Sequence, residues 1–125
     1  MNGCFVLGLD GSGPESFDEI LRFVRESGLY EVQITVQTAF PGTPLYDRLR
    51  REQRILHDGA WERCTLFDVN FQPSNMSVAE LERGLRVLGR QLYDRDATDE
   101  RRRRFRERQR LARREHRAAE RGARK

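Results

Sequence analysis

The sequence predicts an α/β fold in which parallel strands alternate with helices. Two observations carry this prediction: short apolar or alternating segments suit strands, and an amphipathic segment of helical period follows each of them. Strand, helix, strand and helix succeed one another in units of about thirty residues, as in parallel sheets with crossover helices. Two parallel strands alone make a poor sheet, so we expect the chain to form the final portion of a larger α/β domain.

The first strand–helix unit is predicted between Gly3 and Gly28. Gly3–Leu9 is almost wholly apolar, which suits a buried parallel strand, and a glycine-rich turn follows it. Pro14 favours a helix start, and Gly28 is well placed to end that helix. Between them, apolar residues recur at the spacing of one helical face: Phe17, Ile20, Leu21 and Val24.

The second unit contains the most informative turn of the chain. Residues 32–37 alternate between apolar and polar side chains, which predicts a half-buried strand. The turn Thr38–Tyr46 then leads into a helix, with Thr43 as the expected N-cap, Pro44 at the first helical position and an end near Gln53. Because α/β proteins bind ligands outside the carboxyl ends of their parallel strands, this turn is expected to face a ligand.

The rest of the chain divides into a connection, a helix and a tail. Residues 55–73 show no sustained period, so we expect a long connection with one extended piece at Leu66–Phe71. Ser77 and Glu80 form a capping-box pattern, which opens a helix lined by leucines. Gly84 and Gly89 lower the intrinsic stability of that helix, so it needs a partner surface.

Charge is distributed unevenly along the chain. Residues 99–125 hold 12 Arg and 1 Lys against 5 acidic residues, whereas residues 1–98 hold 11 Arg against 15 acidic residues. With few large apolar residues, this tail is expected to be helical or disordered and to bury no face. Its basic character has two alternative interpretations: contact with nucleic acid, or contact with a protein partner.

Several kinds of site find little support in the sequence. Cys4 and Cys64 lie far apart and form neither a metal-binding motif nor a redox pair. His57 and His116 are expected to be surface residues, and Asp10 suits a turn or helix-cap role better than a catalytic one. No apolar run approaches the roughly twenty residues of a membrane span, so no membrane association is expected and the default location is the cytoplasm.

Specific segments of the chain resemble a known enzyme family. Asn2–Gly11 followed by Pro14–Phe17, together with Thr38–Tyr46, resembles the last two strand–helix units of radical S-adenosylmethionine (radical SAM) enzymes. The similarity is greatest to the branch with an N-terminal cobalamin-binding domain, which includes methyltransferases and cyclases. Trp61–Tyr93 resembles the uncharacterised C-terminal extension that follows some of those barrels. The resemblance covers roughly residues 2–94.

This resemblance implies a particular domain organisation. The family has an incomplete parallel (β/α) barrel of six strand–helix units, of which this chain would supply only the last two, in residues 1–54. Residues 55–98 would form the mainly helical C-terminal extension, and residues 99–125 the Arg-rich tail. The earlier strands and the cobalamin-binding part would have to be supplied in cis or in trans.

The resemblance also implies candidate cofactor-binding residues. The family's fifth strand carries a Gly-x-Ile-x-Gly-x-x-Glu pattern beside the adenine of S-adenosylmethionine. Val6 and Gly8 match its Ile and second Gly, and the end of the sixth strand adds Thr38, Ala39 and Phe40 by position. The match is partial, because Cys4 and Gly11 stand where the pattern has its first Gly and its Glu.

The cluster-binding motif of the family is absent from the sequence. Its members bind a four-iron four-sulfur cluster through Cys-x3-Cys-x2-Cys, whereas this chain has two isolated cysteines. We therefore expect no metal, no cofactor and no radical chemistry in the isolated chain, although S-adenosylmethionine, the cluster and cobalamin are implied for the intact enzyme. The alternative interpretation is a small stand-alone interaction protein whose basic tail binds nucleic acid or an acidic partner.

Overall fold

A computed structural model gives the structure of the protein and describes residues 1–123. It contains two parallel strands, β1 (Asn2–Leu7) and β2 (Glu31–Val36), which form one sheet. Helix α1 (Glu15–Ser27) connects them. The strands pair with Asn2 opposite Glu31 and Leu7 opposite Val36, so the sequence prediction of parallel pairing is confirmed.

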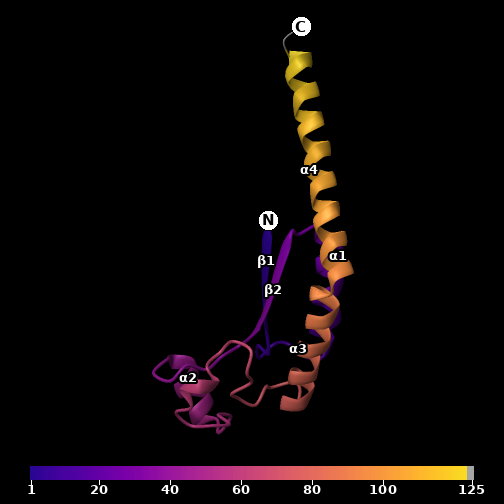
Figure 1. Cartoon of the computed structure of the whole chain (residues 1–125). Coiled ribbons are helices and arrows are strands. Elements are labelled where there is room, and N and C mark those ends of the chain that lie inside the picture. The colour runs from indigo at the N-terminus through magenta and orange to yellow at the C-terminus, as the bar shows by residue number, and fades with distance from the viewer. Residues whose placement is uncertain (124–125) are drawn as a thin grey trace.

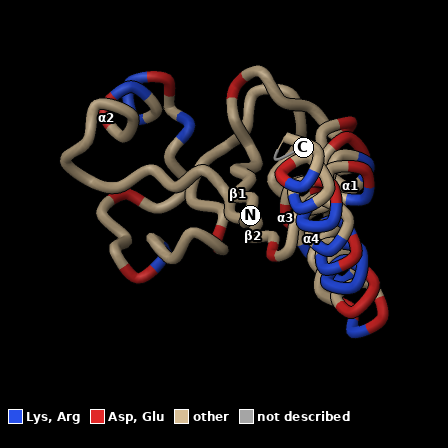
Figure 2. Tube along the Cα trace, turned by 90° about the horizontal axis from the view of Figure 1, so that it is seen from above, with Lys and Arg blue, Asp and Glu red and all other residues tan. Residues whose placement is uncertain are grey.

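The longer helices lie together on one face of this sheet. Helices α1, α3 (Val78–Tyr93) and α4 (Arg95–Ala123) form this layer, whereas α2 (Pro44–Arg51) lies apart from them, beyond the carboxyl ends of the strands (Figures 1 and 2). A short 3-10 turn, η1 (Trp61–Arg63), lies in the long connection after α2. The predicted extended piece at Leu66–Phe71 forms no strand; it contributes one isolated bridge, between Ile55 and Phe71.

The main core fills the space between the sheet and the helical layer. Every second residue of each strand points into it, because side chains alternate between the two faces of a sheet. The core consists of buried residues from both strands, α1, α3 and two connecting segments: Leu7, Leu21, Val24, Leu29, Val32, Ile34, Val36, Val69, Met76, Leu81, Leu88 and Leu92. A smaller cluster beneath α2 contains Ala39, Tyr46, Leu49 and Phe71.

Local signals fix the ends of most helices where the sequence predicts them. Gly28 ends α1 with a left-handed φ of 69°, which glycine adopts without steric cost. The Thr43 hydroxyl accepts a hydrogen bond from the backbone N–H of Tyr46 at the start of α2. Both hydrogen bonds of the predicted capping box between Ser77 and Glu80 are present at the start of α3.

Gly84 lets α1 and α3 approach closely. A Cβ atom added to Gly84 would lie 2.1 Å from Cζ of Phe17, whereas one added to Gly89 would meet its nearest atom at 3.8 Å. The two glycines cost α3 similar intrinsic stability, but only Gly84 is required by a neighbouring side chain.

We therefore expect alanine at these two positions of α3 to have opposite effects. Gly89→Ala should stabilise α3 by about 1 kcal/mol through helix propensity. Gly84→Ala should destabilise it by about 1 kcal/mol net, because overpacking against Phe17 costs about 1–3 kcal/mol. Native-state hydrogen exchange of the α3 amides measures both changes. Equal stabilisation by both substitutions would show that the Phe17 ring moves aside freely.

The Arg-rich tail buries part of its surface, contrary to the expectation from the sequence. It belongs to α4, and Arg101 within it is only 7% exposed; residues 124–125 of the predicted tail lie outside the described residues. Nε of Arg101 donates to the Tyr30 carbonyl at 3.1 Å and Nη1 donates to the Leu92 carbonyl at 2.9 Å. Phe105 packs against the Tyr30 ring with a centroid distance of 5.2 Å. A count of apolar residues does not predict this packing, because the aliphatic part of an arginine side chain can cover a surface while its guanidinium group donates to backbone carbonyls.

Candidate functional site

The candidate site lies where β1 and β2 end. The turns after the two strands, residues 8–13 and 37–43, come together there because the strands run parallel. Arg54 and segment 70–76 of the extension contact these turns through hydrogen bonds. The carboxyl end of the sheet is thus built from both parts of the chain.

The structure places the five predicted cofactor-binding residues in two different environments. Val6 lies on the sheet face opposite the helices and is 47% exposed, and Phe40 is half-buried. Gly8, Thr38 and Ala39 are buried. The Thr38 hydroxyl donates to the carbonyl of Val36 at 3.3 Å. Side-chain surface for a ligand is therefore offered by Val6 and Phe40, while the other three shape the strand ends.

Asn70 clamps the backbone of Ala39. Its side-chain oxygen accepts a hydrogen bond from the Ala39 N–H at 3.2 Å, and its side-chain nitrogen donates to the Ala39 carbonyl at 2.9 Å. Both side chains are almost fully buried, so these bonds satisfy polar groups that water cannot reach. Asn70 is not among the residues expected from the sequence, although its position between apolar Val69 and Phe71 is a signal, since a buried amide needs partners.

Asp10 links the turn after β1 to three other parts of the chain. Its carboxylate accepts hydrogen bonds from Arg48 at 2.7 Å, from Arg54 at 2.9 Å and from the Ser74 hydroxyl at 2.9 Å. The Asn75 side chain donates to the backbone carbonyl of Asp10 at 2.8 Å. Arg54, helped by Arg48 and Ser74, holds the pKa of Asp10 well below its ordinary value of 3.8. Because such a carboxylate stays ionised, it has no proton to supply as a general acid near neutral pH, and its role here is to join segments.

Tyr46 of α2 joins this helix to the turn that follows it. Its hydroxyl donates to the carboxylate of Asp58 and accepts from the backbone N–H of Gly59 at 2.8 Å. The neighbouring carboxylate raises the pKa of Tyr46. The turn after α2 is thereby held against the helix, which keeps the segment that supplies Arg54 in place.

The sheet face opposite the helices is open within the described part of the chain. It presents Cys4, Val6, Gln33 and Thr35, and the Cys4 thiol lies 3.5 Å from the side-chain oxygen of Gln33. Cys4 and Cys64 are both free. Among residues 1–123, no group of three or more His, Cys, Asp or Glu side chains is arranged to hold a metal ion.

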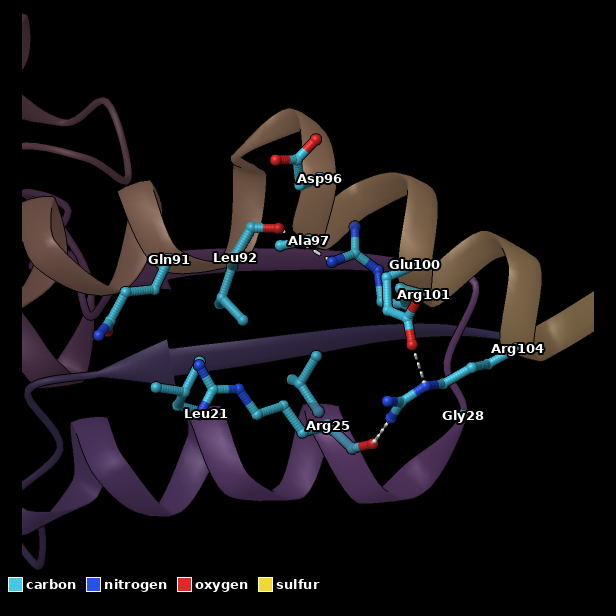
Figure 3. A pocket seen from close by; sticks show the side chains of 11 residues that line it. Leu21, Arg25, Gly28, Gln91, Leu92, Asp96, Ala97, Glu100, Arg101 and Arg104 are labelled. Carbon is cyan, nitrogen blue, oxygen red and sulfur yellow. Dashed lines mark hydrogen bonds and ion pairs between the residues drawn. The ribbon is translucent and has the colours of Figure 1, made fainter.

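A separate hollow of about 460 Å³ lies in the helical layer. Leu21 and Leu92 contribute to its apolar wall, and Arg104 joins two sides by donating to Glu100 at 2.6 Å and to the carbonyl of Arg25 at 3.5 Å (Figure 3). Its remaining lining is Val24, Gly28, Gln91, Asp96, Ala97 and Arg101. Gly28 and Arg101 place this hollow beside the start of β2, at the end of the sheet where parallel α/β proteins do not carry their active sites.

No helix in the described part of the chain has both the length and the apolar character needed to cross a membrane.

Comparisons with known proteins connect the chain to one family and to methylases. The sequence model of a family described as "Domain of unknown function (DUF4070)" matches residues 43–125. The hopanoid C-2 methylase of Rhodopseudomonas palustris (strain TIE-1) is 42% identical over 53 residues, which cover 42% of this chain and 10% of the methylase. An uncharacterized methyltransferase of Synechocystis is 33% identical over 72 residues, which cover 56% of this chain and 13% of that protein. The matched stretch therefore spans only about a tenth of the length of these relatives.

Proposed function

Because the chain belongs to the DUF4070 family, whose domain is found in radical SAM methylases that bind cobalamin, we propose that it supplies the adenosyl side of such an enzyme's barrel. In this proposal, residues 1–54 supply the last two strands of the barrel, β1 and β2, with the crossover helix α1 between them, while α2 lies apart from the helical layer. Residues 55–98 are the extension that fixes their ends. The intact enzyme would carry out methylation or related radical chemistry.

The observation that carries this proposal is the one-sided covering of the sheet. In a (β/α) barrel the helices lie outside and the other face of each strand points inward, whereas open parallel sheets are covered on both faces. Here α1, α3 and α4 cover one face (Figure 2), and Val6, which points to the other face, is 47% exposed. The inward-facing residues of the proposed barrel are then Cys4, Val6, Gln33 and Thr35.

The hydrogen bonds at the two edges of the sheet support a barrel in which β2 is the last strand. On the outer edge of β2, the Ile34 N–H donates to the Tyr93 hydroxyl at 3.0 Å, and the Val36 N–H donates to the Leu66 carbonyl at 2.8 Å. The extension thus occupies the edge where a further strand would pair. In the described residues β1 pairs with β2 alone, so its other edge can accept the preceding strand of a barrel. These edges support β2 as the last strand of the proposed barrel.

The residues of this chain fit an adenosyl group better than they fit an iron–sulfur cluster. Cys4 and Cys64 cannot supply the three cysteines of a cluster motif, so no step of the reaction is assigned to a cluster on this chain. Val6 and Phe40 offer apolar surface against which an adenine ring would pack. When bound elsewhere in the intact enzyme, the cluster would supply electrons and cobalamin would carry a methyl group.

The proposal predicts that the isolated chain binds no cluster. After anaerobic incubation with iron, sulfide and a reductant, the desalted chain should show no visible absorption of an iron–sulfur cluster and should not cleave S-adenosylmethionine. Apparent binding that survives replacement of both cysteines by serine would be adventitious iron. A cluster that depends on Cys4 or Cys64 would overturn the assignment of the cluster to other parts of the enzyme.

A chimera tests the proposed place of the chain in a methylase. Residues 1–98 would replace the homologous segment of the hopanoid C-2 methylase, and hopanoid methylation would be measured. We expect activity to be retained and Val6→Asp to lower it at least about tenfold, because a charge would enter the wall beside the adenosyl group.

Val87→Asp provides the matched control for this chimera. Val87 is 46% exposed, almost the same as Val6 at 47%, but it belongs to α3 in the helical layer. The control should leave methylation unchanged. Equal losses from both substitutions would count against an adenosyl-facing role for Val6, and a folded but inactive unsubstituted chimera would count against the proposed barrel position.

A further inference from the structure

The C-terminal half of α4 projects beyond the rest of the molecule (Figure 1). Within residues 1–123, Arg108 is the last residue of α4 that forms a hydrogen bond to another element: it donates to the carbonyls of Ser27 and Glu26 at 3.2 and 3.3 Å. Residues 109–123 are helical and exposed along their whole length. A helix of this length is marginal in water without a partner, because most helical stability in proteins comes from packing.

Arginines form a stripe along one side of this projecting helix. The spacing of three or four residues places them on a common face, and we call the following set the basic stripe: Arg106, Arg110, Arg114, Arg117 and Arg121. Within the described chain, none of the five takes part in an ion pair. Figure 2 shows how basic residues recur along α4.

Repulsion between the arginines of the basic stripe destabilises the helix that carries them. Arg106 and Arg110, Arg110 and Arg114, and Arg117 and Arg121 are all four residues apart, and like charges at that spacing destabilise a helix. The recorded ion pairs offer the stripe no compensating acidic group. A polyanion lying along the stripe would remove this repulsion and stabilise the helix.

We propose that the basic stripe binds the phosphate backbone of double-stranded nucleic acid. Arginine donates paired hydrogen bonds to phosphate oxygens, and such contacts need no base recognition. An α-helix also fits the width of the major groove of a duplex. This inference concerns a surface remote from the strand ends, so it does not rest on the proposed methylase function.

The residues around the stripe favour a duplex over other anionic partners. A helix that lies on a membrane needs a broad apolar face, and protein interfaces are usually anchored by aromatic residues. In residues 109–123, Leu111 is the only large apolar residue, and the side away from the stripe carries Ala112, Glu115, His116 and Ala119. Single strands are held by stacking on aromatic side chains, and the nearest one on α4, Phe105, already packs against Tyr30.

The test measures binding of the full chain to a fluorescent 20-base-pair duplex of random sequence at several salt concentrations. We expect affinity to fall steeply with salt, because neutralising each phosphate contributes about 0.9 to the slope of log K against log salt. Arg114→Gln combined with Arg117→Gln should weaken binding roughly tenfold at low salt and reduce the slope by about 2.

A matched control uses an exposed arginine pair on α3 with the same spacing. Arg83→Gln combined with Arg86→Gln removes the same charge from α3 and should leave both affinity and slope unchanged. Equal weakening by the two double variants would mean that binding depends only on net charge and would overturn the proposal. It would also fail if the chain bound phosphatidylglycerol vesicles or a single-stranded oligonucleotide more tightly than the duplex, or if it bound none of them at low salt.

Discussion

Replacing Gly8 with alanine is expected to destabilise the carboxyl end of β1 by about 2–5 kcal/mol. Gly8 has a φ of 82°, where a residue with a Cβ atom carries a strain of roughly 1–2 kcal/mol. The added Cβ would also lie 2.9 Å from Cδ2 of Leu81 and 3.4 Å from Cζ of Phe71. Both neighbours are fully buried, so neither can move without disturbing a core, and overpacking adds about 1–3 kcal/mol.

Gly11→Ala is the control for this substitution, because a Cβ on Gly11 would meet no atom within 4 Å. It lies in the same turn and should change stability by less than about 0.5 kcal/mol. Hydrogen exchange of the amides of β1 and α3 measures the free energy of local opening in both variants. If Gly8→Ala left exchange in α3 unchanged, the close contact between the β1 turn and Leu81 would be wrong.

Replacing Asp10 with asparagine is expected to loosen the extension by about 2 kcal/mol at neutral pH. The substitution keeps the size of the side chain but removes the charge that Arg48 and Arg54 bind. Hydrogen bonds to charged groups contribute about 1.5–3 kcal/mol each, and the partial exposure of Asp10 reduces their combined effect through solvent screening. Exchange should accelerate most in residues 70–77, while Glu82→Gln, on the exposed surface of α3, should have little effect.

The effect of Asp10 should depend on pH in one direction. Its folded-state pKa is lowered, so its stabilising contribution is complete above the unfolded pKa of about 4 and decreases as pH falls below that value. The difference between the wild-type chain and Asp10→Asn should therefore be constant from pH 8 to about pH 5 and shrink on further acidification. A difference that grew on acidification would mean that Asp10 is not held in its ionised form by the two arginines.

The local elements of the fold could be predicted because their signals lie within a few residues of one another. The end of α1 at Gly28, the N-cap at Thr43 and the capping box at Ser77 all depend on neighbours along the chain. The parallel pairing of β1 and β2 followed from the helix between them. The basic character of residues 99–125 was also visible, but its packing was not, because Arg101 is buried by carbonyl acceptors that the sequence does not mark.

The position of the candidate site was predictable from the sequence, but the contacts that hold it together were not. The turn beginning at Thr38 could be assigned to a strand end from its pattern, and the structure brings it together with the turn containing Gly8. The hydrogen bonds of Asn70 to Ala39 could not be predicted, because the two residues are 31 positions apart and an asparagine in a connection has many potential partners. By helix propensity alone Gly84 is a weak point of α3, and only the tertiary structure shows the Phe17 ring packed against it.

By itself, the sequence determined the strand and helix segments, their parallel order and the concentration of arginines near the C-terminus, because these depend on period and composition. The tertiary structure decided which face of the sheet stays open, why Gly8 and Gly84 must be glycine and how Asp10 joins the β1 turn to the extension. These features depend on contacts between residues distant in sequence, such as Asp10 and Ser74, 64 positions apart. Local pattern cannot specify such contacts, since they form only when packing of the core brings separate segments within reach of one another.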